Sequence, residues 1–404
     1  MINITDNSKC SGCHACYNSC PTHCITMKAD EEGFLYPSVN YDLCVNCGEC
    51  EKVCPFSDTE KRKEPIGAWA AKCSDEQLCF ESSSGGVFSL LARKTVEAGG
   101  IIFGAAFSED FREVCHIAVD NVDNLIRLRT SKYVQSTVGD SYRAAKACLD
   151  AGKPVLFSGT PCQIAGLKNY LGKEYDDLLC VDVVCHGVPS PKLWGKYLNS
   201  IAEKYQGSIV NVNFRHKKAD RQRFGISRTS DGLEIFVSKS TDPYMQMFLK
   251  NYSLRPSCYQ CITKETGSAA DITLGDFWGI HKVLPEMNDG KGTSLVIVHN
   301  AKGQQLLNDI SDQVDAKRVT YDTAVKYNSS IYQSAAKPAE REAFFFDMNS
   351  LSFDDFLQKY SRPQNTSIRQ SLSDTALWKK LRPLIRGEAA DKLEYGLLVS
   401  IRKN

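Results

Sequence analysis

The sequence of 404 residues lacks both a long apolar run and an excess of charge of one sign. A membrane-spanning helix needs about 18 or more consecutive apolar residues, and the chain contains no such run. Its 49 Lys and Arg residues balance its 48 Asp and Glu residues to a formal net charge of +1. Proteins that bind nucleic acid through bulk charge are strongly basic. We therefore expect no transmembrane segment and no nucleic-acid partner.

The first nine residues are polar and lack the apolar core of a secretory signal. Cysteine, in contrast, is abundant, with 18 residues in the chain. Disulfide frameworks belong to secreted proteins, whereas cysteines in a reducing compartment commonly bind metals. We therefore expect a cytoplasmic protein whose cysteines bind metal. The length and the hydrophobic fraction of 42% are typical of a soluble globular chain with two or three domains.

Eight of the cysteines form two copies of one pattern. The pattern Cys-x-x-Cys-x-x-Cys-x-x-x-Cys-Pro covers residues 10–21 and again residues 44–55. This is the spacing of bacterial ferredoxins, and two copies predict two 4Fe-4S clusters. A zinc site needs only four ligands and usually shows two Cys-x-x-Cys pairs. The eight predicted ligands are Cys10, Cys13, Cys16, Cys20, Cys44, Cys47, Cys50 and Cys54.

The fourth cysteine of each copy is expected to bind the other cluster, as it does in two-cluster ferredoxins. This rule divides the eight cysteines into a first cluster site and a second cluster site. The first cluster site consists of Cys10, Cys13, Cys16 and Cys54, and the second of Cys44, Cys47, Cys50 and Cys20. Cys24 has no place among these ligands, so we expect it to be a packing residue rather than a ninth ligand.

The chain changes character after the second cysteine copy. Residues 58–65 are charged, poor in apolar side chains and end in proline, which indicates a linker. Residues 1–57 before it are predicted to form a small α+β bacterial-ferredoxin domain. Residues 66–335 are predicted to form an α/β domain, with a boundary between its N- and C-terminal parts near residues 150–160. Residues 336–404 are predicted to form a helical C-terminal tail.

Apolar segments of strand length alternate with helical segments in the predicted α/β domain. This order is typical of a mixed, partly parallel sheet with flanking helices. The predicted strands are residues 67–73, 101–107, 114–119, 154–158, 178–184, 271–275 and 294–299, with 209–214, 224–228 and 233–237 in an antiparallel patch. The predicted helices are residues 86–98, 140–151, 161–171, 191–205, 244–250 and 303–314, and the tail is predicted to be helical from residue 353, with an apolar and basic stretch at 378–382.

Two strand ends are predicted to bring further cysteines to one edge of the sheet. Gly159, Thr160 and Pro161 follow a buried strand, with Thr160 as the expected N-cap and Pro161 at the first helical position. Cys162 then lies in the first helical turn, where the helix dipole favours a thiolate. Cys185 follows the next strand, and parallel strands would place it at the same edge.

The pair Cys258-x-x-Cys261 adds two more thiolates. Together with Cys162 and Cys185 they make four, which is enough for a third 4Fe-4S cluster. A zinc ion or a redox-active disulfide at the pair remains the alternative, because a single Cys-x-x-Cys pair is a weak signal. We refer to these four cysteines as the third cluster site.

Two polar segments near the same predicted edge suit an anion. Residues 82–86 open a helix and offer backbone amides, hydroxyls and glycines for a phosphate. Residues 131–133 add the cation Lys132 and an aromatic ring. No Gly-x-Gly-x-x-Gly follows a predicted strand, so a Rossmann dinucleotide site is not indicated. A flexible helix entry is the alternative for residues 82–86. The basic run at residues 215–218 is either a solvated loop or a contact for an anionic substrate.

Six short segments occur in an order that resembles one protein family. They are residues 82–86 (SSSGG), 131–136 (SKYVQS), 159–163 (GTPCQ), 185–187 (CHG), the pair Cys258-x-x-Cys261 and residues 271–279 (DITLGDFWG). The ordered set resembles the coenzyme F420 hydrogenase/dehydrogenase beta-subunit family, preceded by a two-cluster ferredoxin domain. The resemblance covers about residues 1–335. Members with such a ferredoxin domain also occur in polysaccharide biosynthesis clusters.

The resemblance implies a bound FAD, and it supports a 4Fe-4S cluster at the third cluster site. A flavin can exchange single electrons with clusters and electron pairs with an organic molecule. We therefore expect an iron–sulfur flavoprotein oxidoreductase. Its expected electron partner is a ferredoxin or another redox protein, and its expected substrate is coenzyme F420 or a sugar-derived molecule. The implied FAD-binding residues are Ser83, Ser84, Gly85, Gly86, Lys132, Gly159, Thr160 and Pro161.

A non-catalytic electron-transfer subunit of a larger redox complex is the alternative function. The length of the α/β part favours the enzyme, because a relay needs no substrate cavity. A cluster-based redox sensor is less favoured, since the sequence contains no DNA-binding helix or basic stripe. The sequence identifies no catalytic residue and no direction of electron flow.

Overall fold

The computed structural model describes residues 1–57, 60–205, 207, 209–218, 223–230 and 233–361. Met1–Phe353 form one compact unit, and Asp354–Asn404 form a second. The predicted apolar and basic stretch at residues 378–382 lies outside the described residues, as does the rest of the tail beyond residue 361. Among the described residues, no helix combines the length and the hydropathy that crossing a bilayer requires.

The doubled cysteine pattern is also doubled in backbone conformation. Gly12 and Asn46 occupy equivalent places in the two copies, and both adopt the left-handed region, with φ of 66° and 51°. His14 and Gly48 are equivalent too, with φ of 65° and 77°, and each precedes a short helix. These helices are α1 (Ala15–Ser19) and α2 (Glu49–Lys52). The sequence repeat thus produces two similar cysteine loops.

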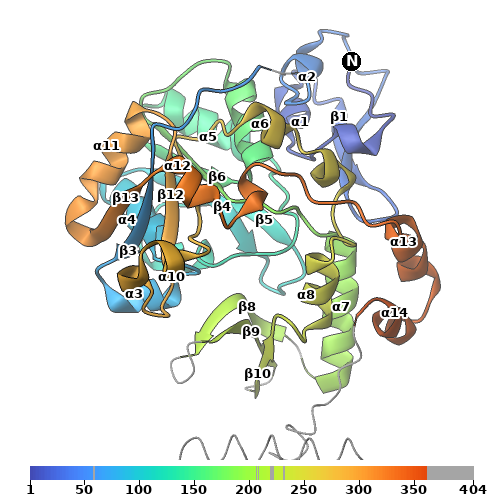
Figure 1. Cartoon of the computed structure of the whole chain (residues 1–404). Helices are drawn as coiled ribbons and strands as arrows, with labels where there is room; N and C mark the ends of the chain where they lie inside the picture. The colour runs from blue at the N-terminus through green and yellow to red at the C-terminus, as the bar shows by residue number, and fades with distance from the viewer. Residues whose placement is uncertain (58–59, 206, 208, 219–222, 231–232, 362–404) are drawn as a thin grey trace, which may run out of the picture. The chain divides into compact units, whose positions relative to one another are not determined.

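A two-stranded hairpin separates the two cysteine copies. Strand β1 (Ile25–Ala29) pairs antiparallel with β2 (Leu35–Val39), with Ile25 opposite Val39. The short 3-10 helix η1 (Asn7–Lys9) precedes the first cysteine. Figure 1 shows this small part in blue, with α1 next to the α5 and α6 helices of the larger part.

The larger part is built on an eight-stranded sheet in the order β13-β3-β12-β11-β7-β6-β4-β5. The four neighbours β11, β7, β6 and β4 run parallel to one another, and the outer pairings are antiparallel. This confirms the predicted mixed, partly parallel sheet. The strands are β3 (Gly67–Cys73), β4 (Ile101–Phe107), β5 (Val114–Val119), β6 (Val155–Gly159), β7 (Leu178–Val183), β11 (Ile272–Asp276), β12 (Ser294–Val298) and β13 (Val314–Val319).

Helices cover both faces of this sheet, because its central strands carry apolar side chains on both sides. One face packs against α4 (Val87–Glu97) and α11 (Ala301–Asp309), through residues such as Leu91 and Leu307. The other packs against α5 (Ser141–Asp150) and α6 (Pro161–Leu171), through residues such as Tyr142 and Leu167. Cys13 of the ferredoxin part belongs to this second core. The small and the large part therefore share one hydrophobic cluster.

Arg143 of α5 fastens α1 to the larger part by hydrogen bonds to backbone carbonyls. Its Nε donates to Asn18 O at 3.0 Å and its Nη2 donates to Tyr17 O at 2.6 Å. The guanidinium also lies over the Tyr17 ring, 4.9 Å from the centroid. These contacts fix the last turn of α1 and therefore the loop that precedes it.

A three-stranded antiparallel sheet in the order β10-β9-β8 confirms the predicted antiparallel patch. Its strands are β8 (Ile209–Lys218), β9 (Arg223–Ser230) and β10 (Leu233–Ser238), and the adjoining helices are α7 (Pro191–Tyr205) and α8 (Pro243–Leu249). Trp194 of α7, Phe214 of β8 and Tyr244 of α8 form an aromatic cluster with ring centroids 5.0–6.0 Å apart. Strand β8 extends through residues 215–218, so the basic run lies in a strand and not in a loop.

Several elements differ from the sequence prediction, among them the short helices α9 (Ile262–Thr266), α10 (Ile280–Val283) and α12 (Tyr321–Val325), which were not predicted. The helix predicted at residues 303–314 ends at Asp309, and β13 begins at Val314. Most residues of β13 are exposed or half-buried, because β13 is an edge strand, and its sequence therefore lacks a strong apolar signal. Helix α3 (Glu76–Glu81) was not predicted either, because six residues are too few for a periodic pattern. The remaining helices are α13 (Arg341–Ser350) and α14 (Phe353–Tyr360).

Candidate functional site

The first cluster site surrounds one small pocket. All four of its cysteines line this pocket, together with apolar side chains that include Ile2, Ile4, Met27 and Phe56. Burial raises the pKa of the Cys13 and Cys16 thiols, and neighbouring cysteines raise it further. Metal coordination would offset this cost, because a coordinating thiol loses its proton to the metal's charge.

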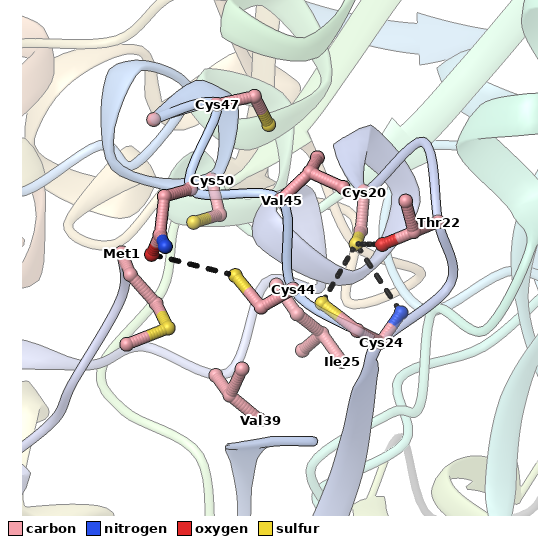
Figure 2. Close-up of a pocket in the computed structure, with 12 residues that line it drawn as sticks. Met1, Cys20, Thr22, Cys24, Ile25, Val39, Cys44, Val45, Cys47 and Cys50 are labelled. Carbon is pink, nitrogen blue, oxygen red and sulfur yellow. Dashed lines mark hydrogen bonds between the residues drawn. The ribbon is translucent and has the colours of Figure 1, made fainter. Parts of the chain in front are cut away.

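The second cluster site surrounds another pocket, which Figure 2 shows from close by. Cys44, Cys47 and Cys50 line it together with Cys20 from the first copy. Each pocket is therefore lined by three cysteines of one copy and the fourth of the other, the crossed arrangement that the spacing predicts. A backbone amide points at one of these sulfurs: Ile2 N donates to Cys50 Sγ at 3.3 Å.

Cys24 lines the pocket of the second cluster site as well. Its Sγ is 3.3 Å from Cys20 Sγ, and its backbone N donates to the same sulfur at 3.3 Å. Two of the dashed lines at Cys20 in Figure 2 mark these contacts, and the third runs to Thr22 Oγ1. The residue predicted to serve packing thus lies against a predicted ligand.

The four cysteines of the third cluster site also lie together. Cys162 is in the first turn of α6, Cys185 follows β7, and Cys258 and Cys261 lie in or beside the 3-10 helix η3 (Pro256–Gln260). Burial raises the pKa of Cys258, and the charges of Cys185, Cys261 and Cys162 each act on it. Val188 N donates to Cys258 Sγ at 3.4 Å.

The first turn of α6 has the predicted cap. Thr160 is the N-cap, Pro161 is at the first helical position, and Thr160 N donates to Gln163 Oε1 at 2.9 Å. The Thr160 hydroxyl lies 3.2 Å from Cys162 Sγ. Burial nevertheless raises the pKa of Cys162, so burial outweighs the expected effect of the helix dipole on the metal-free thiol.

The spacing of these cysteines bears on the kind of metal group. In the part of the chain that the structure describes, no three His, Cys, Asp or Glu side chains converge closely enough to hold a single metal ion. A zinc ion would draw four thiolates to about 2.3 Å from one centre. Four thiolates that lie farther apart suit a larger group, because each thiolate of a 4Fe-4S cluster binds a different iron.

Helix α6 joins the first and third cluster sites. A Cβ atom built on Gly166 would lie 2.9 Å from Cys13 Sγ, so the helix backbone abuts a first-site cysteine. Cys162 of the third site lies one turn earlier on the same helix. One rigid element therefore fixes the separation of two predicted clusters.

The serine–glycine loop at residues 82–86 is held at the carboxyl edge of the sheet. Gly85 N donates to Ser294 Oγ at 2.9 Å, and Ser131 N donates to Ser83 Oγ at 2.8 Å. Gly86 is the N-cap of α4 with a φ of 82° and provides no side-chain cap, which leaves first-turn amides for an anion. Gly85 has a packing role of its own, since a Cβ there would lie 2.3 Å from Ala71 O.

Lys132 is half-buried near this loop, and within the described residues its hydrogen bonds run to backbone carbonyls and not to a carboxylate. Its Nζ donates to the backbone carbonyls of Arg129 at 2.7 Å and Arg127 at 3.0 Å. Burial lowers the pKa of Lys132 to about 7. The charge of Lys132 also lowers the pKa of His116, although burial is the larger cause. The His116 Nε2 atom is 3.1 Å from Ser158 O, next to Gly159. His116 thus links Lys132 to the residues 159–161 of the predicted FAD set.

Two residues of the basic run contact the serine–glycine loop. Lys217 Nζ donates to Ser84 O at 2.8 Å, and Arg215 Nη2 donates to Ser83 O at 3.4 Å. Arg215 also pairs with Asp276 at the end of β11. The alternation of side chains along β8 directs residues 215 and 217 to the same face. The sequence did not reveal that Arg215 and Lys217 contact the serine–glycine loop, because in a run of four basic residues the alternation of side chains cannot be seen.

A cavity of about 250 Å³ lies beside the third cluster site, with Pro161 and Cys185 in its lining. Asp182, fully buried in its wall, accepts a hydrogen bond from Ser268 Oγ at 2.5 Å and another from Thr273 Oγ1. Burial raises the pKa of Asp182 to about 6. Thr273 Oγ1 lies 2.7 Å from His299 Nε2, and burial lowers the pKa of His299 to about 4. These residues come from separate segments of the chain, and of them only Thr273 lies in a segment that the sequence singled out, residues 271–279.

Comparison with known proteins identifies two segments. Residues 9–57 match the family described as 4Fe-4S dicluster domain. Residues 152–322 match the family described as the C terminus of the coenzyme F420 hydrogenase/dehydrogenase beta subunit. The first segment contains all eight cysteines of the two N-terminal sites, and the second contains all four cysteines of the third site.

Three curated relatives illustrate the two halves. The coenzyme F420-dependent sulfite reductase of Methanocaldococcus jannaschii is 24% identical over 317 residues, covering 76% of this chain and 46% of the relative. One subunit of the F(420)H(2) dehydrogenase of Methanosarcina mazei is 23% identical over 294 residues, covering 68% of this chain and 77% of the relative. The PorD subunit of pyruvate synthase from Thermotoga maritima is 38% identical over 64 residues, covering 16% of this chain and 61% of the relative.

The chain spans about half the length of the sulfite reductase that it matches. The dicluster match covers the hairpin-bearing part, whereas the other match begins just before β6 and covers only the later strands of the larger sheet. The resemblance seen in the sequence is therefore confirmed. The chain is therefore similar to the coenzyme F420 hydrogenase/dehydrogenase beta-subunit family at residues 152–322 and to 4Fe-4S dicluster domains at residues 9–57.

Proposed function

We propose that this protein is an iron–sulfur flavoprotein oxidoreductase that binds three 4Fe-4S clusters and one FAD per chain. The observation that carries the proposal is the grouping of twelve cysteines into three sets of four, each assembled from more than one segment of the chain. Two of these sets line small pockets, and four thiolates are the ligand set of a 4Fe-4S cluster. The two matched families support the same chemistry.

The positions of the three sites support a route for single electrons. Cys47 of the second cluster site is exposed, so a ferredoxin or another redox protein would exchange electrons there. The first cluster site lies farther in, against Gly166 of α6. The third site shares α6 with it, and residues 159–161 lead directly into that helix. The route therefore runs from the second site through the first and third sites to the FAD.

The chain's own residues would bind and orient the FAD at the carboxyl edge of the sheet. The first-turn amides after Gly86 and the hydroxyls of Ser83 and Ser84 suit its phosphates. When bound, FAD would exchange single electrons with the clusters and electron pairs with an organic molecule. An anion close to Lys132 would keep this ammonium charged, although burial alone lowers its pKa to about 7.

We propose coenzyme F420 as the organic substrate, because the names of two of the relatives include this coenzyme. The cavity beside the third cluster site is our candidate for binding an organic molecule there. Asp182, with a pKa of about 6, could donate or accept a proton in its wall. A sugar-derived substrate and the cytoplasmic location stay predictions from the sequence.

Metal and flavin analysis of the anaerobically purified protein tests the proposal. We expect about twelve irons, as many acid-labile sulfides and one FAD per chain. Cys162→Ser and Cys185→Ser should reduce the iron to about eight. The matched control is Cys148→Ser, because Cys148 lies on α5 outside the three sites and its loss should leave the iron unchanged. About eight irons and no FAD in the unaltered chain would contradict the proposal.

The alternative is a non-catalytic subunit that relays electrons within a larger complex. One relative, from the F(420)H(2) dehydrogenase of Methanosarcina mazei, is named as a subunit. The purified chain, loaded with clusters and FAD, separates the two functions. Reduction of coenzyme F420 by this chain with a reduced ferredoxin supports the enzyme. Clusters that bleach with dithionite while coenzyme F420 stays oxidised would favour the relay.

A further inference from the structure

Arg255 is completely buried, and its hydrogen bonds within the described residues reach no acidic side chain. Its side chain is 0% exposed. Nε donates to Cys10 O at 2.7 Å, one Nη donates to Leu35 O at 2.9 Å, and the other donates to Gln135 Oε1 at 3.1 Å. In the part of the chain that the structure describes, no Asp or Glu pairs with this guanidinium.

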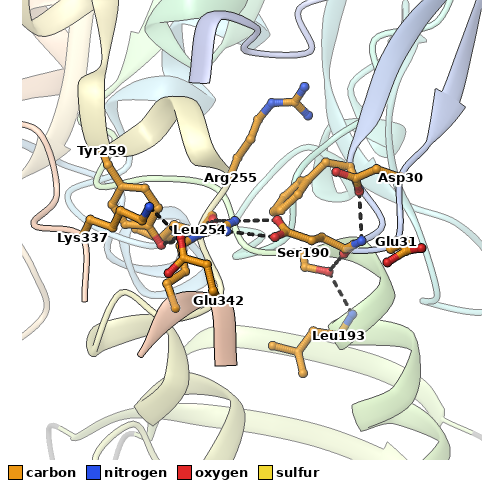
Figure 3. A network of polar contacts seen from close by, with 12 residues as sticks. Asp30, Glu31, Ser190, Leu193, Leu254, Arg255, Tyr259, Lys337 and Glu342 are labelled. Atoms are coloured by element: carbon orange, nitrogen blue, oxygen red, sulfur yellow. Dashed lines mark hydrogen bonds and ion pairs between the residues drawn. The ribbon is translucent and has the colours of Figure 1, made fainter. Parts of the chain in front are cut away.

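Arg341 provides a comparison, because it contacts Leu254 and Tyr259, which Figure 3 labels together with Arg255. It is also buried, at 4% exposure, and it forms two hydrogen bonds with the Glu32 carboxylate, the closer at 2.5 Å. Arg341 and Arg255 both connect the ferredoxin part to the larger part, since Glu32 and Leu35 flank the start of β2. Only Arg341 has its charge balanced by a carboxylate.

A buried charge without a partner is costly, and proteins pair buried charges or place them against metal groups. The anions available to Arg255 are cysteine thiolates. Its Nη2 lies 3.5 Å from Cys10 Sγ, which belongs to the first cluster site. Its backbone carbonyl accepts a hydrogen bond from Cys258 N at 2.9 Å, in the third cluster site. The charge of Arg255 also acts to lower the pKa of Cys162 in the third cluster site, so the guanidinium lies close to two of the predicted clusters.

The position of the guanidinium is fixed by the surrounding residues. It stacks over the Tyr36 ring at 4.2 Å and lies 5.4 Å from the Phe34 ring centroid. A Cβ at Gly12 would lie 2.9 Å from its Nη1, so glycine is required there for the arginine to fit. A fixed charge in a buried, low-dielectric place acts strongly on its neighbours.

We propose that Arg255 is the counter-ion of the cluster at the first cluster site and raises the reduction potential of that cluster. Reduction adds one negative charge to the cluster, and a nearby buried cation stabilises the reduced form. Each transfer moves one electron from a donor, which is oxidised, to this cluster, which is reduced, and no bond is made or broken. The higher potential lets the first site accept an electron from the exposed second site. This inference rests on the proposed clusters and adds a positioning residue that no cysteine pattern reveals.

Redox titration of the cluster-loaded protein, followed by electron paramagnetic resonance, tests this role. The signal of the first cluster is assigned as the one that Cys13→Ser alters. Arg255→Gln, which removes the charge and keeps a similar size, should lower the potential of this cluster by about 59 mV or more, a tenfold change in a one-electron equilibrium. Arg255→Lys keeps a charge in a less suitable shape and should lower it less. The potentials of the other signals should change less than that of the first cluster.

Arg341→Gln is the matched control, because it weakens the same contact between the two parts without touching a cysteine. It should leave the first cluster's potential unchanged. An unchanged potential in Arg255→Gln, or an equal decrease in Arg341→Gln, would overturn the proposal. If Arg255→Gln loses iron, Arg255→Lys decides: retained iron with a potential near the unaltered value supports the role, and loss of iron in both overturns it. Iron content of the unaltered protein, measured separately, shows whether the clusters themselves are present.

Discussion

The first and second cluster sites come from one repeated pattern, yet their surroundings differ. The first site packs against α6, shares a hydrophobic core with α5, and has Arg255 beside Cys10. The second site is closed by the hairpin and the N-terminal residues, includes a fifth cysteine, and exposes Cys47. The same ligand spacing therefore serves two environments. We infer that the second site exchanges electrons with an external partner and the first passes them inward.

The potential of a 4Fe-4S cluster depends on nearby charge, hydrogen bonds to sulfur and solvent exposure. All three differ between the two sites, although the cysteine loops have matching left-handed residues. The surroundings of the two cluster sites differ because residues of the larger part pack against the first cysteine loop. The predictions below change one site's surroundings and use a feature near the other or far away as the control.

The ion pair between Arg341 and Glu32 fastens the hairpin near the first site, and its loss should have the largest effect. Arg341→Gln leaves Glu32 without a partner. Breaking a fully buried pair costs about 3–5 kcal/mol of folding stability. Because Glu32 is partly exposed, we expect a loss of about 3 kcal/mol. Lys52→Gln, which breaks the exposed pair with Glu49 beside the second site, should change stability little. Anaerobic chemical unfolding measures both, and equal losses would contradict the difference.

Gly166→Ala tests how closely α6 approaches the first site. The new methyl group would meet Cys13 Sγ at 2.9 Å, so one of them must move. We expect a loss of about 1–3 kcal/mol, as in other overpacked cores, together with partial loss of iron. Gly195→Ala on α7 is the control, because a Cβ there meets no atom within 4 Å. It should stabilise the protein by up to about 1 kcal/mol. The same sign of change in both variants would contradict the account.

Lys132 should make FAD binding depend on pH. Burial lowers the pKa of Lys132 from 10.5 to about 7 in the FAD-free protein. The folded protein therefore loses this proton before the unfolded chain does, and burial of the charge costs stability that is recovered as the pH rises from about 7 to about 10.5. FAD pairs with the charged form, whose share falls from about one half at pH 7 to about one tenth at pH 8, so the affinity for FAD should fall about fivefold. Fluorescence titration of FAD measures this, and Lys132→Gln should bind FAD more weakly and lose the pH dependence. An equal pH dependence in Lys132→Gln would contradict the assignment.

Cys24→Ala should have the smallest effect. Its thiol lies 3.3 Å from Cys20 Sγ, and a hydrogen bond to a ligating sulfur raises the potential of a cluster. Removing it should lower the second cluster's potential slightly, by less than Arg255→Gln lowers that of the first. Iron content should stay unchanged. A loss of iron would instead make Cys24 a ligand and contradict its predicted packing role.

Local sequence predicted the parts of the molecule that depend on residues close together in the chain. The doubled cysteine pattern, the strands β4, β6 and β7, and the cap of α6 at Thr160 all follow from spacing, apolar runs and turn residues. The third cluster site combines three distant segments, so spacing alone left zinc or a disulfide open, and the ordered family segments favoured a cluster.

The remaining features depend on tertiary contacts. Arg255 is unremarkable in sequence, and only the fold places it beside Cys10 and Cys258. Lys217 was part of a basic run with two open interpretations, and the structure buries it against Ser84. The edge strand β13 carries too few buried residues to reveal itself. Charge placement and edge pairing are therefore the features that the sequence could not supply.

Anaerobic reductive titration of the FAD-loaded protein tests the central claim most directly. Three clusters take one electron each and FAD takes two. The account predicts about five electrons per chain, with flavin and cluster absorbance both bleached at the end. An uptake of about two electrons with no flavin signal would contradict it, because only the two N-terminal clusters would then be present.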